Sequence, residues 1–227
     1  MKEWNDSRFF NLASKYYFSN QNFLLSFLDV IPGTELLDIG CGNGDFTLMV
    51  AQRLGTQIMN GIDINSDCLK EARSKGIKVK CHDIDQGIPY KNESIDVIVS
   101  NQVVEHIFNV DSYFREIYRI LRKDGYAIIS TPNLSSLHNL IFINLGMQPP
   151  GLHISEIQVG NFLYGTRTHG HIRLFSISAL KDLAKYHNFK IEKITGFGMY
   201  PFPLLISNIL SKAFARYCVY LNIKIRK

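Results

Sequence analysis

The chain has 227 residues, of which 46% are hydrophobic and 20% are charged, and 25 Lys and Arg against 20 Asp and Glu give a formal net charge of +5. This length and composition predict one folded domain with a substantial core and exclude a disordered chain. No run of about 18 apolar residues indicates a membrane-spanning helix. The amino-terminal sequence MKEWNDSRFF lacks the apolar stretch of a secretory signal, so we expect a cytoplasmic protein.

The excess of positive charge lies in one part of the chain. Glu192 is the last acidic residue, and the chain up to it carries 19 basic and 20 acidic side chains. Six cations follow: Lys193, Lys212, Arg216, Lys224, Arg226 and Lys227. A protein that binds nucleic acid along a groove typically spreads Lys and Arg over a working face. The distribution therefore argues against a nucleic-acid partner.

Short apolar runs alternate with segments of helical periodicity up to residue 133. The pattern predicts strands at 35–40, 57–64, 78–83, 95–100 and 126–131, and helices at 46–54, 66–75 and 111–121. We expect Ser66 and Asp67 to cap the second of these helices, and Lys123-Asp124-Gly125 to end the third. Such alternation predicts a parallel sheet with helices on both faces, and so the α/β fold class.

The alternation then breaks. Residues 126–155 contain no Asp, Glu, Lys or Arg and include an apolar helical piece at 134–145, which is typical of a lid or binding element. Further along, the periodicity predicts helices at 176–187 and 203–217 and strands at 189–194 and 219–226. Apolar and polar residues alternate in the last strand, which predicts that one of its faces is exposed.

The helix expected at 203–217 carries a broad apolar face: Leu205, Ile206, Ile209, Leu210, Ala213 and Phe214. We expect this helix to pack on the sheet with its charges in solvent. The alternative is peripheral contact with an anionic membrane surface through the basic carboxyl-terminal tail.

Residues 37–45, LDIGCGNGD, predict a strand that opens into a glycine-rich turn and a helix. Glycines there let a ligand approach the backbone, because they carry no Cβ. The dinucleotide fingerprint needs G-x-G-x-x-G, but here the third glycine comes one residue early. No phosphate-binding lysine follows, so the loop is not a P-loop. Asp38 would oppose a diphosphate and suits a ligand that carries an ammonium group.

Two further acids fall at predicted strand ends. Asp63 ends the second strand, where a carboxylate can accept both ribose hydroxyls of a nucleoside. Asp83 ends the third strand, and its side chain with the Ile84 amide could meet the amine and ring nitrogen of adenine. Ligands of open parallel sheets bind at the carboxyl ends of the strands, so three acids at three consecutive strands predict a nucleoside site.

The segments LLDIGCGNGDF, GIDINSDCL, CHDIDQGIPY, IDVIVSNQVVEHI and LRKDGYAIISTPN resemble the ordered motifs of class I S-adenosylmethionine-dependent methyltransferases. The later segments resemble, more loosely, a small-molecule branch that is related to quinone-pathway O-methyltransferases. The resemblance implies a Rossmann-like, doubly wound sheet of seven strands, the last one antiparallel, with a helical lid insertion. It implies one domain with a helical cap at 1–32, a cofactor-binding core at 33–133, a lid at 134–175 and completing elements at 176–227.

The resemblance also implies the cofactor, S-adenosylmethionine, and its binding residues. Asp38, Gly40, Cys41, Gly42 and Gly44 would line the methionine part. Asp63 and Ile64 would hold the ribose, Asp83 and Ile84 the adenine, and Asn101 would lie under the sulfonium.

A phenol or alcohol acceptor must lose a proton, so a base is expected near the substrate, and His171 and His106 are the candidates. The alternatives are a lid or cap contact for His171 and a structural hydrogen bond for His106. Some relatives bind a divalent metal through Glu-x-x-Glu-His, but here Gln102 replaces the first Glu. We therefore expect no metal, although Glu105, His106 and His171 could form a weaker site.

These observations favour methyl transfer from S-adenosylmethionine to an oxygen of a small apolar or aromatic acceptor. The alternatives are N- or C-methylation of a lipid-linked or saccharide intermediate, a non-catalytic S-adenosylmethionine-binding or partner-binding protein, and a nicotinamide-dependent oxidoreductase. DNA amino-methylation is disfavoured, because Ser100-Asn101-Gln102-Val103 lacks the Pro-Pro-aromatic pattern of those enzymes. The oligomeric state and the acceptor stay open.

Overall fold

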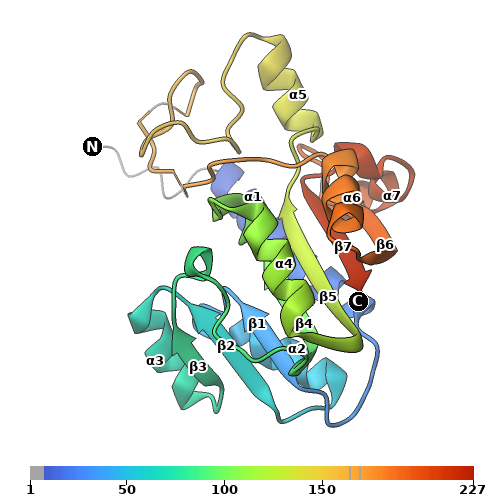
Figure 1. Cartoon of the computed structure of the whole chain (residues 1–227). Coiled ribbons are helices and arrows are strands. Elements are labelled where there is room, and N and C mark those ends of the chain that lie inside the picture. Colours follow the sequence, from blue (N-terminus) through green and yellow to red (C-terminus); the bar gives the residue numbers. More distant parts are fainter. Residues whose placement is uncertain (1–7, 164, 169) are drawn as a thin grey trace.

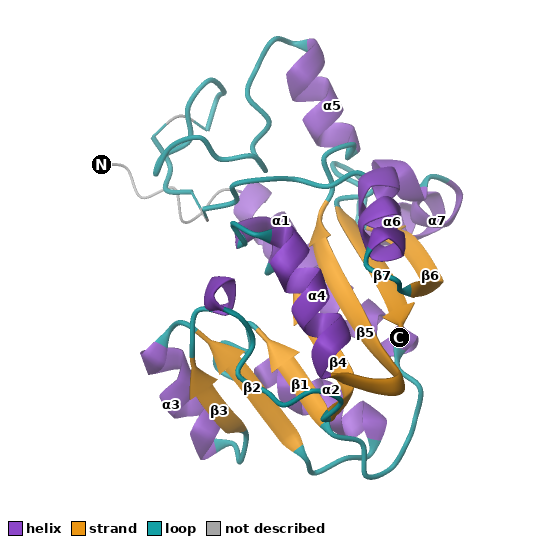
Figure 2. Ribbon diagram, in the orientation of Figure 1, coloured by secondary structure: helices purple, strands orange, loops and turns teal. Residues whose placement is uncertain are grey.

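The computed structural model describes residues 8–163, 165–168 and 170–227, with side chains from residue 13 onward. Its seven-stranded sheet has the order β3-β2-β1-β4-β5-β7-β6 (Figures 1 and 2). The strands are β1 (Leu36–Ile39), β2 (Met59–Asp63), β3 (Lys78–Cys81), β4 (Ile95–Asn101), β5 (Leu121–Pro132), β6 (Lys190–Phe197) and β7 (Tyr220–Arg226). The helices are α1 (Arg8–Leu24), α2 (Asp45–Leu54), α3 (Ser66–Ser74), α4 (Val110–Ile120), α5 (Leu137–Asn144), α6 (Ile177–Tyr186) and α7 (Leu204–Ala213).

The sheet is doubly wound, because successive residues of its central strands enter two different cores. Leu36 contributes to a core with α1, α2 and α3, whereas Leu37 contributes to a core with α4 and α6. β1 to β5 run parallel, and β7 runs antiparallel between β5 and β6. The fold expected from the sequence is confirmed, including the antiparallel seventh strand. Among the described residues, no helix combines the length and apolarity that crossing a bilayer requires.

The prediction that β7 has one exposed face is wrong. Its side chains are buried on both faces as far as Ile225, because β7 lies inside the sheet and α1 covers its polar side. Asn222 there donates to Asn20 of α1 at 2.8 Å, and Asn20 donates to Ser130 of β5 at 2.9 Å. Lys224 extends the same polar side to Asp29, at 2.7 Å. The polar side of β7 is therefore covered by α1 and by Asp29 and not by water, although Asn222 Oδ1 itself has no partner among the described residues.

Three expected element ends shift in the structure. Asn65 caps α3 in place of Ser66 and Asp67, because its side chain accepts from the amides of Asp67 and Cys68. α4 ends at Ile120, and Lys123-Asp124-Gly125 lies within the long strand β5 and does not stop the helix. β3 ends at Cys81, so Asp83 belongs to the turn that follows it.

Between β5 and α6, residues 134–175 contain α5 and a long irregular segment. This segment extends beyond the strand ends, at the top of Figure 1. Its irregular part contains an isolated bridge between Ile157 and Arg167, and a bridge between Asn133 and Phe175 brings the two ends of the segment together. The segment therefore lies where a cover over the carboxyl ends of the strands would lie.

Candidate functional site

Most of the residues expected to bind cofactor lie along one edge of the sheet. β3, β2, β1 and β4 are parallel neighbours, so their carboxyl ends lie side by side. That edge holds the glycine loop after β1, Asp63 at the end of β2, Asp83 after β3 and Asn101 at the end of β4. The parallel topology thus brings together residues that are up to about sixty positions apart in the chain.

Asp63 fixes the glycine loop. Its Oδ2 accepts from the Gly42 amide and its Oδ1 from the Asn65 amide, both at 2.8 Å. The space beside Gly42 is open, since a Cβ there would meet nothing within 4 Å. At Gly44, by contrast, a Cβ would overlap the Ile77 side chain. Gly42 is therefore the glycine of this pair beside which a ligand has room, and Gly44 is needed for packing.

Asp38 is buried behind the loop. Thr47 of α2 donates to its Oδ2 at 2.6 Å. Burial, with the nearby Asp63 charge, raises the pKa of Asp38 to about 7, although the Thr47 hydrogen bond opposes the rise. A cationic group that approaches this buried carboxyl would favour its ionised form and pair with it, and the ammonium group of the cofactor is such a group.

Gly40 and Cys41 turn the chain at the end of β1, and their amides donate to the Ile62 carbonyl at 2.8 and 3.0 Å. The Cys41 side chain is buried against Gly61 of β2. Burial raises the pKa of its thiol to about 12, so the thiol stays neutral. A ligand contact from Cys41 would therefore come from its backbone.

The loops after β2 and β3 flank the end of the site expected to hold adenosine. Ile64 leaves 70% of its surface exposed there, which is unusual for an isoleucine beside a polar turn. Asp83 accepts from the Asp85 amide at 3.0 Å, and Ile84 packs on the core. Asp85 itself accepts from the amides of Phe108 and Asn109, so it ties this loop to the segment after β4.

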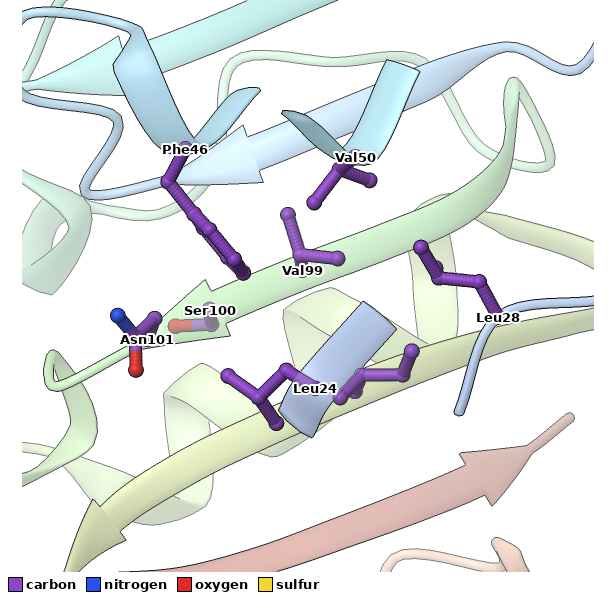
Figure 3. Close-up of a pocket in the computed structure, with 8 residues that line it drawn as sticks. Leu24, Leu28, Phe46, Val50, Val99, Ser100 and Asn101 are labelled. Atoms are coloured by element: carbon purple, nitrogen blue, oxygen red, sulfur yellow. The ribbon is translucent and has the colours of Figure 1, made fainter. Parts of the chain in front are cut away.

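Asn101 meets α1 at the end of β4. Its Nδ2 donates to the Tyr17 hydroxyl at 3.5 Å, and its buried Oδ1 has no hydrogen-bond partner among the residues described. Figure 3 shows Asn101 at the tip of β4, beyond the apolar contact that Phe46 and Leu24 make around Val99. This oxygen can accept a hydrogen bond, so it fits a donor group of a bound cofactor. Sequence reasoning missed Tyr17, because nothing local ties α1 to β4.

A second group of polar side chains lies between the end of β4 and the 134–175 segment. Glu105, His106 and His171 each place one ligand atom within 4.8 Å of the others. The rings of His106 and His171 meet edge to face, with centroids 4.9 Å apart. The Ile172 amide donates to the Glu105 carbonyl at 3.1 Å, which holds the two segments together. The two histidines expected as base candidates are therefore neighbours.

Backbone carbonyls fix which nitrogen of each ring carries the proton. The Nδ1 atom of His171 lies 3.1 Å from the Gly151 carbonyl, and that of His106 lies 3.2 Å from the Gly170 carbonyl. Because a carbonyl only accepts, each neutral ring is protonated at Nδ1, and its Nε2 is the atom that can take up a proton. His153 stacks on His171 at 4.8 Å and accepts from the His171 amide, so it acts as a support. His169, a further histidine of the 134–175 segment, lies outside the described residues.

Glu105 is fully buried beneath this pair. Thr131 of β5 donates to its Oε2 at 3.0 Å, and its Oε1 lacks a partner within the described part of the chain. Burial raises the pKa of Glu105 to about 8, so the carboxyl is largely protonated at neutral pH. The group also has the composition of a divalent-cation site, so the expectation that no metal binds stays untested.

A cavity of about 190 Å³ adjoins His171. Its walls include His138, His153, Gln158, Tyr200 and Tyr220. The apolar residues of α5 do not line it, and Ile141, Ile143 and Leu145 are exposed. Within the uncharged stretch at 126–155, histidine and proline residues therefore face the cavity, whereas the apolar side chains of α5 do not.

The fold and the strand-end site define an S-adenosylmethionine-dependent methyltransferase. A family model described as a methyltransferase domain matches residues 13–194, and the chain belongs to this family. Membership of this family, together with the fold, implies S-adenosylmethionine and not a nicotinamide as the cofactor.

Several known proteins are similar to the chain. A ubiquinone biosynthesis O-methyltransferase of Pelagibacter ubique is 27% identical over 175 residues, which are 73% of this chain and 65% of that protein. The mitochondrial enzyme of the same description from Rattus norvegicus is 25% identical over 181 residues, 76% of this chain and 49% of its own length. An S-adenosylmethionine-dependent methyltransferase structure from Mesorhizobium loti has a TM-score of 0.64 at 19% identity and covers 91% of this chain and 96% of its own. The chain spans between about half and two-thirds of these two curated relatives.

Proposed function

We propose that this methyltransferase methylates an oxygen of a small aromatic acceptor in the cavity beside His171. The observation that carries the proposal is the position of a basic histidine nitrogen, backed by a buried carboxyl, at a cavity with aromatic walls. Tyr200, Tyr220 and His138 offer ring surfaces and hydrogen-bonding groups, which suit a hydroxylated ring better than a plain hydrocarbon. The relatives named for ubiquinone biosynthesis O-methylation support the same kind of acceptor.

We propose that the cofactor lies across the carboxyl ends of β1 to β4. Asp38 would face its ammonium group, and the backbone from Gly40 to Gly44 would contact its methionine part. Asp63 and Ile64 would bind the ribose, and Asp83 and Ile84 the adenine. Asn101, held by Tyr17, would turn its unpaired oxygen toward the sulfonium. When bound, S-adenosylmethionine supplies a methyl group on a positively charged sulfur that is already activated for displacement.

The protein then has to orient the acceptor, exclude water and receive one proton. His171 borders the cavity and is the proposed base, with Nε2 as the proton acceptor. His106 is the second candidate, and it contacts His171 through its ring edge. We propose that neutral Glu105 is a positioning residue, which holds this segment without placing a negative charge beside the base.

The test measures methyl transfer from labelled S-adenosylmethionine to matched catechol, aniline and fatty-acid acceptors, with and without a chelator. Product from the catechol alone supports the proposal, and His171→Ala should then lower kcat by about 10²- to 10⁴-fold. Preference for the amine would favour N-methylation instead. Activity that a chelator abolishes and a divalent ion restores would reassign Glu105, His106 and His171 to a metal site. If His171→Ala loses turnover but binds S-adenosylhomocysteine with unchanged affinity, the defect lies at the acceptor cavity and not at the cofactor site.

A further inference from the structure

The outer face of α7 is apolar. Leu205 and Ile209 are 78% and 66% exposed, and Ile206 and Phe214 beside them are about half exposed. The fully buried residues of the helix are Ser207 and Ser211, and at its start Leu204 packs against the aromatic cluster around Tyr16 and Tyr200. The helix therefore contacts β6 with its charged side chains in solvent, as expected, but most of its apolar face points outward.

Specific hydrogen bonds hold α7 in this orientation. The buried Met199 amide donates to Ser207 Oγ at 2.8 Å, and Ser211 Oγ donates to the Ser207 carbonyl at 2.7 Å. Turning the helix to bury Leu205 and Ile209 would leave the Met199 amide without its acceptor, a loss that buried groups rarely tolerate. The outward apolar face is thus built into the fold.

The cations of the carboxyl-terminal part sort into two groups. Lys224 and Arg226 pair with Asp29 and Glu192, and Lys227 pairs with Glu93. Lys193 lies over the Phe27 ring at 4.0 Å. These four are engaged with the sheet and the amino-terminal segment, so the tail as a whole is not a free basic surface.

The other two cations lie beside the apolar face. Lys212 follows Leu205 and Ile209 by seven and three positions, which places it on the same side of the helix. It has no ion pair with any described residue, and Arg216 in the next turn is exposed, with its guanidinium over the Tyr217 ring. No Asp or Glu occurs anywhere from residue 193 to the end of the sequence. An apolar strip with cations and no acids is complementary to an anionic lipid surface.

We propose that the outer face of α7 docks on an anionic membrane surface, through Leu205, Ile206, Ile209 and Lys212 of the helix and Phe214 and Arg216 directly after it. The ten-residue helix is about 15 Å long, half the thickness of the hydrocarbon core, so it would lie in the interface and not cross it. α7 contacts β6, the strand at the edge of the sheet (Figure 1). A second copy docked through the same face would bring Lys212 and Arg216 close to their own counterparts, which is unfavourable.

The test measures binding of the whole chain to vesicles of phosphatidylcholine with and without phosphatidylglycerol, by flotation. We expect binding to the anionic vesicles that falls when salt is raised to about 0.5 M. Leu205→Gln with Ile209→Gln, and separately Lys212→Glu with Arg216→Glu, should each lower the partition coefficient by about tenfold or more. The substituted side chains are exposed, so the fold should survive, and circular dichroism checks this.

Two matched controls distinguish binding through the outer face of α7 from nonspecific hydrophobic or electrostatic binding. Val30→Gln with Ile31→Gln removes two exposed apolar side chains before β1, and Lys70→Glu with Arg73→Glu makes the same charge change on α3. Both should bind anionic vesicles as the unsubstituted chain does. Equal binding to both vesicle types, no binding to either, or equal losses in the controls would overturn the proposal. A dimer that Leu205→Gln with Ile209→Gln dissociates would instead identify a second copy as the occupant. Neither result depends on methyl transfer.

Discussion

Asp63 at the end of β2 accepts a hydrogen bond from the backbone amide of Gly42, 21 positions earlier, at 2.8 Å. The carboxylate proposed to hold the ribose is therefore also the group that shapes the loop proposed to hold the methionine part. Each oxygen of Asp63 takes one amide and keeps one lone pair for a further donor. The two halves of the cofactor site are in this way coupled through one side chain.

Asp63→Ala should weaken S-adenosylhomocysteine binding by about 1–3 kcal/mol, because it removes ribose acceptors and releases the Gly42 amide. Isothermal titration measures this change. Asp67→Asn, on the exposed side of α3, is the matched control and should bind normally. An unchanged affinity for Asp63→Ala would refute the ribose assignment.

Tyr17→Phe removes the hydroxyl that accepts from Asn101 and from Gln21. We expect S-adenosylhomocysteine to bind about 2- to 10-fold more weakly, since the Asn101 amide loses its fixed orientation. The neighbouring Phe18→Leu changes an exposed ring and should leave affinity alone. If Tyr17→Phe binds as tightly as the unsubstituted chain, α1 does not position Asn101.

Gly44→Ala should destabilise the fold by about 1–3 kcal/mol beyond the cost of the left-handed backbone, because the new Cβ overlaps Ile77. Gly146→Ala is the control, with a positive φ of 70° and open space around it, so it carries the backbone cost alone. Urea unfolding of both variants gives the difference. Equal destabilisation would mean that the Ile77 side chain moves aside for the added methyl group.

The stability of the fold should depend on pH through Asp38. Its pKa is raised from an ordinary 3.8 to about 7, so between these values the unfolded chain releases a proton that the folded chain keeps. Raising the pH across this window therefore favours unfolding, by at most about 1.4 kcal/mol per pH unit. Asp38→Asn should flatten this part of the profile, as followed by urea unfolding between pH 4 and pH 7.5.

Thr47→Val should change the same pH profile in the opposite direction, because it keeps the Asp38 carboxyl and alters its pKa. It removes the hydrogen bond that favours ionised Asp38 and so raises the Asp38 pKa further, and the fall in stability should therefore continue to a higher pH than in the unsubstituted chain. Parallel pH profiles for the two variants and the unsubstituted chain would show that Asp38 is not the titrating group.

The sheet and the strand-end acids could be predicted from sequence, because local patterns encode both. Apolar runs of fixed length mark parallel buried strands, and ligands collect at their carboxyl ends. The cap of α3 was misplaced by a single residue, since Ser66 and Asn65 are both good caps and only the side-chain geometry decides between them. The burial of β7 was missed because α1, some 200 positions away, supplies its polar partners.

The acceptor side of the site could not be predicted from local sequence patterns. Glu105 and His171 come from segments 66 positions apart, and their meeting depends on the path of an irregular loop that no periodicity describes. The orientation of α7 depends on one backbone amide, Met199, whose need for an acceptor outweighs the exposure of several apolar side chains. The acceptor side of the site and the orientation of α7 therefore depend on long-range contacts and on single buried polar groups, which local sequence patterns do not reveal.

The position of β7 between β5 and β6 has a consequence for synthesis on the ribosome. β6 is made before β7 but lies outside it, so it has no neighbour in the sheet until residues 220–226 emerge. Until then β5 presents an unpaired edge, the kind of edge that recruits other chains. A nascent chain paused between these two strands is therefore exposed to aggregation, and chaperone capture of such paused chains should end once β7 is released.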